Sequence, residues 1–403
     1  MLHADLHLGG SFRAFAQLKS NAQNGYNGAP EPPEVDYLDY NQAFLDYRTR
    51  LGAKNAITVR GGRQEISYGG GRLLSFGEGP NPRLSFDGEK AILQMGTVRV
   101  DAFQLQPIKT GRSDFDDGTL TAQRLFGVYA TAAPLVQKGI GMDLYYLGFD
   151  RKQASFNHAT ANEHRQTFGT RFFGQVGGLD YNEEAAYQGG RFGGGHISAY
   201  MLATDTGYTV AHRGCQPRLG LRANVLSGDH DSKDPNLQTF NPMYPRGDFY
   251  DEPGFFGNAN LMDLRPSLDL YFGKTPTLAK VAVTLDTIFF WRESVRDGLY
   301  NSGLGPVTLV AGAGGQYVGT QHTAHLYWLI DRHLTFVVNY AHLTAGGYLH
   351  DAGGHDANYG ESILTLTIYF KSGVVSTSVC QRRNQSIADA SFTIAKYRCA
   401  SLS

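Results

Sequence analysis

Several segments in which apolar residues occupy alternate positions carry arginine at one or two of the positions between them, and this is the chain's clearest chemical signal. In one such segment Arg218 and Arg222 alternate with Leu219 and Leu221. A guanidinium keeps its charge at physiological pH and offers forked donors that match a carboxylate. If the apolar positions meet lipid, these arginines face the inside of a β-barrel, where a ring of them would select anions.

Alternation assigns more cations than acids to the inward face of the predicted strands. The cations are Arg48, Arg60, Arg99, Arg165, Arg171, Arg218, Arg222, Lys280 and Arg292, and the acids are Asp46, Asp101, Asp180, Glu184, Asp269 and Asp286. We therefore expect a net positive lumen, in which Arg165, Arg171, Arg218, Arg222 and Arg292 form an arc that attracts carboxylates. The alternative is that many of these arginines pair with acids on neighbouring strands and only hold the wall in shape.

No catalytic or metal-binding constellation is visible. The 13 His are scattered, and Cys215, Cys380 and Cys399 lack zinc-type spacing. The glycine runs 69–71 and 193–195 are not followed by Lys and Ser or Thr, so they are not phosphate loops. Residues 229–234 resemble a calcium loop only faintly, since its turn glycine and closing Glu are missing. We expect neither an enzyme nor a bound metal or cofactor.

The elements that must position the arginines are β-strands, because the apolar period is two almost throughout. The predicted strands are 2–8, 11–19, 38–49, 56–66, 89–95, 98–107, 123–132, 140–149, 164–175, 179–188, 196–210, 216–226, 267–272, 279–292, 318–329, 333–344 and 361–370. Most have about ten residues, the length that a tilted membrane-spanning strand needs. Minimal turns alternate with long polar connections, as in an outer-membrane barrel. The fold class is therefore all-β, a single transmembrane antiparallel barrel of about 16–18 strands.

The connections predict how the two rims differ. The long segments 19–36, 107–122, 150–163, 227–265 and 345–360 alternate with turns as short as 177–178 and 330–332. We expect 19–36, 107–122, 227–265 and 345–360 on one rim, with at least one segment folded into the mouth, because a long connection without regular structure is usually functional.

Composition narrows the class of protein. The formal net charge is −1, which gives no global argument for binding nucleic acid. Charged residues make up 18% of the chain and aromatic residues 12%, mostly the Phe and Tyr that strands favour. No stretch has the 18 consecutive apolar residues of a membrane-spanning helix.

Several sequence blocks form a recognisable combination: Gly62-Arg63-Gln64-Glu65, Tyr68-Gly69, Arg72-Leu73 and residues 81–88, 217–222, 227–229, 239–246, 258–261, 290–292 and 297–300. Together they resemble the alginate export domain family of outer-membrane porins. The resemblance covers roughly residues 35–370. It implies a monomeric barrel of about 18 strands in the outer membrane. It also implies an electropositive, arginine-lined pore for a polyuronate.

The resemblance raises a question about Arg63. Counting outward from Ile57 and Val59, alternation places Arg60 in the lumen and Arg63 on the lipid side. A lipid-facing arginine at mid-depth costs about 2–4 kcal/mol. We therefore expect either a bulge at Gly61-Gly62 that turns Arg63 into the pore or a position near the rim. Arg83 is a second candidate inward cation, on a loop; its alternative is a salt bridge with Asp87.

Both chain ends depart from a complete porin. Seventeen strands is an odd number, and Met1 is followed by no readable export signal. Bacterial single-chain barrels have even strand numbers, so we expect the barrel, residues 1–370, to lack at least one N-terminal strand. Residues 371–403 show no barrel pattern, and we expect a C-terminal tail outside the barrel.

Three functions remain open. The first is a channel for an anionic polysaccharide or its oligomers, and the second is a channel for small solutes such as aromatic acids or sugars. The third is a soluble all-β binding or enzymatic domain. The expected partners are an anionic solute and outer-membrane lipid, with no nucleic acid, and the expected state is a monomer.

Overall fold

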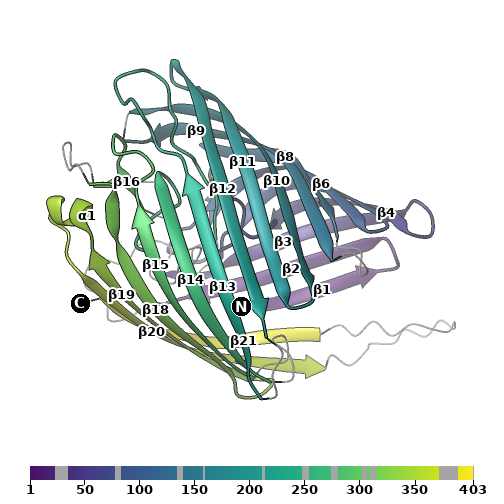
Figure 1. The fold of residues 1–403 in the computed structure, drawn as a ribbon. Helices are drawn as coiled ribbons and strands as arrows, with labels where there is room; N and C mark the ends of the chain where they lie inside the picture. Colours follow the sequence, from purple (N-terminus) through teal and green to yellow (C-terminus); the bar gives the residue numbers. More distant parts are fainter. Residues whose placement is uncertain are drawn as a thin grey trace.

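The computed structural model contains one large antiparallel sheet, in which each long strand pairs with the next long strand along the chain (Figure 1), and a small sheet of two short strands. It describes residues 1–22, 35–77, 83–133, 139–157, 159–210, 214–246, 254–273, 280–301, 306–308, 315–371 and 389–402. Within these ranges no helix is long and apolar enough to cross a membrane.

Eighteen long strands form the sheet in the described part of the chain. They are β1 (Leu2–Leu8), β2 (Phe12–Asn21), β3 (Asp36–Arg50), β4 (Asn55–Gln64), β5 (Phe86–Met95), β6 (Val98–Lys109), β8 (Gln123–Ala132), β9 (Ile140–Ser155), β10 (Thr160–Val176), β11 (Leu179–Phe192), β12 (Gly195–Thr209), β13 (Gln216–Leu226), β14 (Leu261–Phe272), β15 (Val281–Trp291), β18 (Tyr317–Leu329), β19 (Leu334–Ala345), β20 (Ala357–Lys371) and β21 (Asp389–Leu402). The short elements are β7 (Gly118–Thr119), β16 (Leu299–Tyr300), β17 (Pro306–Thr308) and α1 (Gly347–Asp351). All seventeen strands predicted from alternation are present, which confirms the all-β prediction.

The faces of the sheet are those of a membrane barrel. On β3, Leu45 is 67% exposed while its neighbour Asp46 is 7% exposed. On β13, Leu219 is 64% exposed, whereas Asn224 on the opposite face is buried. On these strands apolar side chains point outward and polar side chains point inward, the reverse of a soluble fold, because the outer surface is solvated by lipid.

Successive connections lie at opposite rims because the strands run antiparallel. One rim carries short turns such as 9–11, 51–54, 96–97, 177–178 and 330–333. The other carries the connections 22–35, 65–85, 110–122, 227–260, 292–316 and 346–356. The ends of the flanking strands confirm the predicted placement of the long segments on one rim, while residues 23–34 and 247–253 of these segments lie outside the described residues. The predicted loop 150–163 is much shorter, because β9 extends to Ser155 and β10 begins at Thr160.

The chain ends differ from the sequence prediction. Residues 389–402 form β21, which pairs with β20, so the sheet continues beyond the predicted boundary at residue 370. With β21 the described strands number eighteen, an even count in place of the predicted seventeen. Phe392 and Ile394 begin an alternation that Lys396 and Arg398 interrupt, which is why the sequence pattern missed this strand. The sheet curves until β1 and β21 come into contact, although no backbone pairing joins them in the described residues (Figure 1).

Candidate functional site: an arginine cavity inside the barrel

Two long connections fold into the barrel and meet there. The β4–β5 loop (residues 65–85) and the β13–β14 loop (residues 227–260) form a parallel bridge between Leu74 and Tyr244. The backbone N–H of Ser75 donates to the Tyr244 carbonyl at 2.8 Å, and that of Arg246 donates to the Gly71 carbonyl at 2.8 Å. The prediction that at least one long segment folds into the mouth holds for the β13–β14 loop, whereas the β4–β5 loop was not among the segments predicted to do so.

Apolar packing fixes both loops against the inner wall. Leu74 and Phe240 are buried in one cluster with Leu105, Leu125 and Leu147 from β6, β8 and β9. The Tyr244 ring also packs edge-on against Phe86, with ring centroids 5.0 Å apart. Since a buried apolar side chain contributes about 1.5–3 kcal/mol, these contacts hold the loops as part of the wall.

The glycine run 69–71 explains how the β4–β5 loop reaches the middle of the barrel. Gly69 and Gly71 have φ values of +59° and +74°, a conformation that side chains with a Cβ seldom adopt. A Cβ on Gly69 would lie 2.7 Å from the hydroxyl oxygen of Tyr129, and one on Gly70 would lie 3.1 Å from Nη1 of Arg72. The run therefore allows the backbone to approach the wall closely and deliver Arg72.

A cavity of about 340 Å³ lies where the two loops meet the wall. We call it the arginine cavity. It is lined by Ser67, Gly69, Gly70, Gly71, Arg72, Ser75, Phe76, Asn182, Asp205, Arg222 and Arg246. Three guanidinium groups thus face it with a single carboxylate, that of Asp205. Because the three come from two loops and from β13, they converge only in the folded chain.

The wall fixes Arg72 and Arg222 through polar contacts. Nη1 of Arg72 donates to Oδ1 of Asn182 and to Oε2 of Glu184, both at 2.9 Å, and Nη2 donates to the Asn182 carbonyl at 3.0 Å. Arg222 reaches Oδ2 of Asp205 through Nη2 at 3.0 Å, and its side chain remains 28% exposed. The cavity is therefore lined by guanidinium groups that the wall fixes in place and that can bind a carboxylate.

Most of the predicted pore arginines pair with acids of the wall. Oδ1 of Asp46 lies 2.7 Å from Nε of Arg60, and Oδ1 of Asp101 lies 2.7 Å from Nε of Arg99. Asp143 holds Arg171 at 2.7 Å. Arg218 contacts three carboxylates, at 2.6 Å, 3.4 Å and 3.1 Å, those of Asp180, Asp205 and Asp269. Asp143, Glu163 and Asp205, which hold arginines here, were not in the predicted inward set.

The predicted arc of five arginines is divided between two depths. Arg165 is fully buried, where it bonds Glu163 at 2.6 Å and the Thr239 carbonyl at 3.1 Å, and so anchors the β13–β14 loop. Arg292 donates to the carbonyls of Val295, Asp297 and Gly315 and thus organises the rim. Arg171, Arg218 and Arg222 lie deeper, and among them only Arg222 lines the arginine cavity. Arg48 is exposed near the end of β3 at the short-turn rim.

Arg63 does not face the pore. The pairing of β3 with β4 and of β4 with β5 is continuous through Gly61 and Gly62, so no bulge turns Arg63 inward. It keeps the outward parity of Val59 and lies next to the last residue of β4, at the long-loop rim. There Asp87 accepts from its Nε at 3.0 Å. The rim position, the second of the two expectations, removes the cost of a charge at mid-depth.

Arg83 pairs with Glu65 at 3.7 Å and lies over the Phe76 ring, instead of pairing with Asp87. Arg72, Arg246 and Asp205 line the cavity but were not predicted to face the pore. Arg72 and Arg246 do lie in the sequence blocks that resemble the family, and Arg72 directly follows the glycine run.

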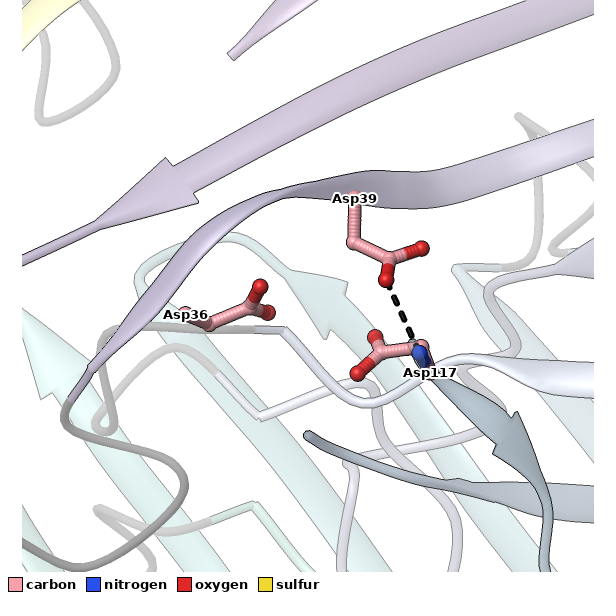
Figure 2. A group of neighbouring side chains, drawn as sticks. All are labelled: Asp36, Asp39 and Asp117. Atoms are coloured by element: carbon pink, nitrogen blue, oxygen red, sulfur yellow. Dashed lines mark hydrogen bonds between the residues drawn. The ribbon is translucent and has the colours of Figure 1, made fainter. Parts of the chain in front are cut away.

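A second polar cluster lies near the long-loop rim and consists of Asp36, Asp39 and Asp117 (Figure 2). We call it the acid cluster. Its carboxylate oxygens lie within 4.8 Å of one another. Nζ of Lys19 lies 2.7 Å from Asp36 and 2.6 Å from Asp117, so the ammonium occupies the place that a cation would take. The backbone N–H of Asp117 donates to Asp39 at 2.9 Å.

Comparisons with known proteins agree with this architecture. No curated protein matches the chain in sequence. Among solved structures, Acinetobacter baumannii OccAB1 shares the fold with a TM-score of 0.55 and 13% identity, over 88% of this chain and 85% of that one. Pseudomonas aeruginosa OccK3 (OpdO) has a TM-score of 0.52 and 12% identity, over 88% and 83% of the two chains.

A third structure, Pseudomonas aeruginosa OpdK with vanillate, has a TM-score of 0.51 and 10% identity, over 82% of each chain. At these identities the likeness concerns the fold alone, an outer-membrane β-barrel. The alginate export family model matches residues 1–361. With outward apolar strands, loops folded into the barrel and this match over nearly the whole length, the chain belongs to the alginate export family and is an outer-membrane channel protein.

Proposed function

We propose that this channel passes carboxylate-bearing solutes, and that its preferred solute is a uronate oligosaccharide or polyuronate. The observation that supports the proposal is the arginine cavity, where Arg72, Arg222 and Arg246 face one space with Asp205 as the only lining acid. Guanidinium groups bind carboxylates through paired charge-assisted hydrogen bonds. A row of such contacts lowers the barrier for an anion while each contact stays weak enough to release it.

The lining also suits a sugar. Ser67, Ser75 and Asn182 offer hydroxyl and amide groups beside the arginines, and the glycine run brings backbone close to the space. Sugar hydroxyls require such neutral donors and acceptors. A uronate carries both a carboxylate and hydroxyls, so it can use both kinds of group. We propose that the protein transports such a solute, and we propose no catalytic activity.

A second candidate solute is a small aromatic carboxylate. The cavity volume of about 340 Å³ lies at the lower end of the range of about 300–1,000 Å³ for small-molecule sites. A space of this size suits one ring at a time, whether it belongs to an aromatic acid or to one sugar unit of a chain.

Planar-bilayer recordings distinguish the candidates. We expect anions to permeate better than cations, and trigalacturonate to block at lower concentration than vanillate, with neutral maltotriose inactive. Stronger block by vanillate would favour the small-solute channel. A wild-type channel that prefers cations would overturn both.

The triple variant Arg72→Gln, Arg222→Gln and Arg246→Gln should lose the anion preference and the block. Arg48→Gln is the matched control, because Arg48 is an exposed arginine at the opposite rim. A triple variant that keeps its anion preference would remove the arginine cavity as the selective site.

A further inference from the structure

A chain of polar contacts behind the arginine cavity leads from Tyr145 through Glu184 to Arg72. The hydroxyl of Tyr145 donates to Oε1 of Glu184 at 2.8 Å, and Oε2 of Glu184 accepts from Nη1 of Arg72 at 2.9 Å. Tyr145 and Glu184 are each 6% exposed, and Arg72 is 4% exposed. Both carboxylate oxygens therefore have a donor, and the carboxylate cannot turn without breaking one of these bonds.

Of these three residues, only Arg72 lies on a loop. Tyr145 lies on β9 and Glu184 on β11, so both stand on the rigid sheet. The three hydrogen bonds of Arg72 to Asn182 and Glu184 use both hydrogens of Nη1 and one of Nη2. Within the described residues, one hydrogen of Nη2 and that of Nε make no hydrogen bond, so they are available to an acceptor. The wall thus holds one edge of the guanidinium and leaves another edge available.

A second set of a tyrosine, a carboxylate and an arginine lies next to the first, but its arginine does not reach the cavity. Tyr129 donates to Asp143 at 2.7 Å, and Asp143 accepts from Nε of Arg171 at 2.7 Å. All three of these residues lie on strands, and Arg171 packs over the Phe173 ring at 3.8 Å and does not line the cavity. This second set stabilises the wall, whereas the first fixes a loop residue at the cavity.

We propose that Glu184, held by Tyr145, is a positioning residue that orients Arg72 for the carboxylate of the solute. The inference rests on the proposed function and deepens it. The positioning role predicts the opposite effect from the one expected from charge alone. Removing an acid beside an anion site should strengthen anion binding by charge, yet removing this positioning residue should weaken it.

The test compares Glu184→Ala with Glu184→Gln by trigalacturonate block in planar bilayers. The amide oxygen of Gln can still accept from Arg72, so block in Glu184→Gln should remain within about threefold of wild type. Glu184→Ala should need about tenfold more trigalacturonate, the size of one charge-assisted contact. Tyr145→Phe should fall between the two, and Tyr129→Phe is its matched control and should be unchanged. Equal or stronger block in Glu184→Ala would overturn the proposal.

A second readout does not depend on selectivity. Ser75 is 4% exposed on the same loop as Arg72. The background for this experiment carries Cys215→Ser, Cys380→Ser and Cys399→Ser. In it, Ser75→Cys should react slowly with a soluble maleimide, and the reaction should be about tenfold faster when Glu184→Ala is added. If wild type is not blocked by trigalacturonate, the proposed function fails, and the labelling rate alone decides whether Glu184 positions the loop. An unchanged labelling rate in Glu184→Ala would reject the positioning role.

Discussion

The arginine cavity and the acid cluster use the same ion-pair chemistry in opposite proportions. In the cavity, three guanidiniums meet one lining carboxylate, and Arg222 stays 28% exposed. The acid cluster gathers three carboxylates (Figure 2), and the ammonium of Lys19, whose side chain is 2% exposed, pairs with two of them, Asp36 and Asp117. The cluster is sealed and joins β2, β3 and the β6–β8 connection. The cavity keeps donors turned toward open space. Access to solvent, more than the number of charges, distinguishes the proposed binding site from the structural tie.

The largest expected effect concerns the sealed cluster. Lys19→Met removes the ammonium that lies between Asp36 and Asp117 and leaves buried carboxylates without it. Breaking a buried pair by removing one partner costs about 3–5 kcal/mol. We expect a lower midpoint of urea unfolding in detergent, with Lys54→Met, at an exposed turn, as control. Equal midpoints for the two variants would show that the cluster is not a structural tie.

A smaller loss is expected at the glycine run. Gly69→Ala adds a Cβ at positive φ, 2.7 Å from the hydroxyl oxygen of Tyr129. Gly177→Ala is matched to it, since Gly177 has φ +61° and nothing within 4 Å of its Cβ. The left-handed conformation alone costs roughly 1–2 kcal/mol. Gly69→Ala should therefore lose more unfolding free energy than Gly177→Ala, and it should also change single-channel conductance.

Two arginines of β13 should differ in their effect on anion selectivity. Arg222 lines the arginine cavity, whereas Arg218 does not and contacts three carboxylates. Arg222→Gln should reduce the anion-over-cation permeability ratio roughly two- to fivefold, because the site is hydrated and the interaction screened. Arg218→Gln should reduce it less. Reversal potentials in a salt gradient measure both ratios, and a larger effect of Arg218→Gln would contradict the assignment.

The smallest expected effect concerns an exposed carboxylate. Asp331, in the turn between β18 and β19, accepts from the backbone N–H groups of His333 and Leu334 at 2.7 and 2.9 Å. These bonds lower its pKa. Its contribution to stability is therefore present above the unfolded-state pKa and is lost as pH falls through the lowered one. Asp331→Asn should slightly lower the unfolding midpoint at pH 7 but not at pH 2, with selectivity unchanged. An equal loss at both pH values would contradict this explanation.

The sequence determined the strands and their faces. Alternation such as Leu219 and Leu221 against Arg218 and Arg222 depends only on neighbours along the chain, and a lipid-facing surface enforces it over every strand. The lengths of the connections likewise predicted which of them lie together on one rim. The pattern failed for β21, where Lys396 and Arg398 interrupt the alternation.

Only the tertiary structure decided which arginines face open space. Asp143 neutralises Arg171 because β9 and β10 pair in a register that places the two residues opposite each other. Arg72 enters the barrel because a glycine-rich loop returns to contact Asn182, 110 positions later in the chain. A period of two assigns a side chain to a face but carries no information about its partner across strands or about how a loop returns. The face on which a side chain lies is a local property of the sequence, whereas its ion-pair partner and the arginine cavity are properties of long-range contacts.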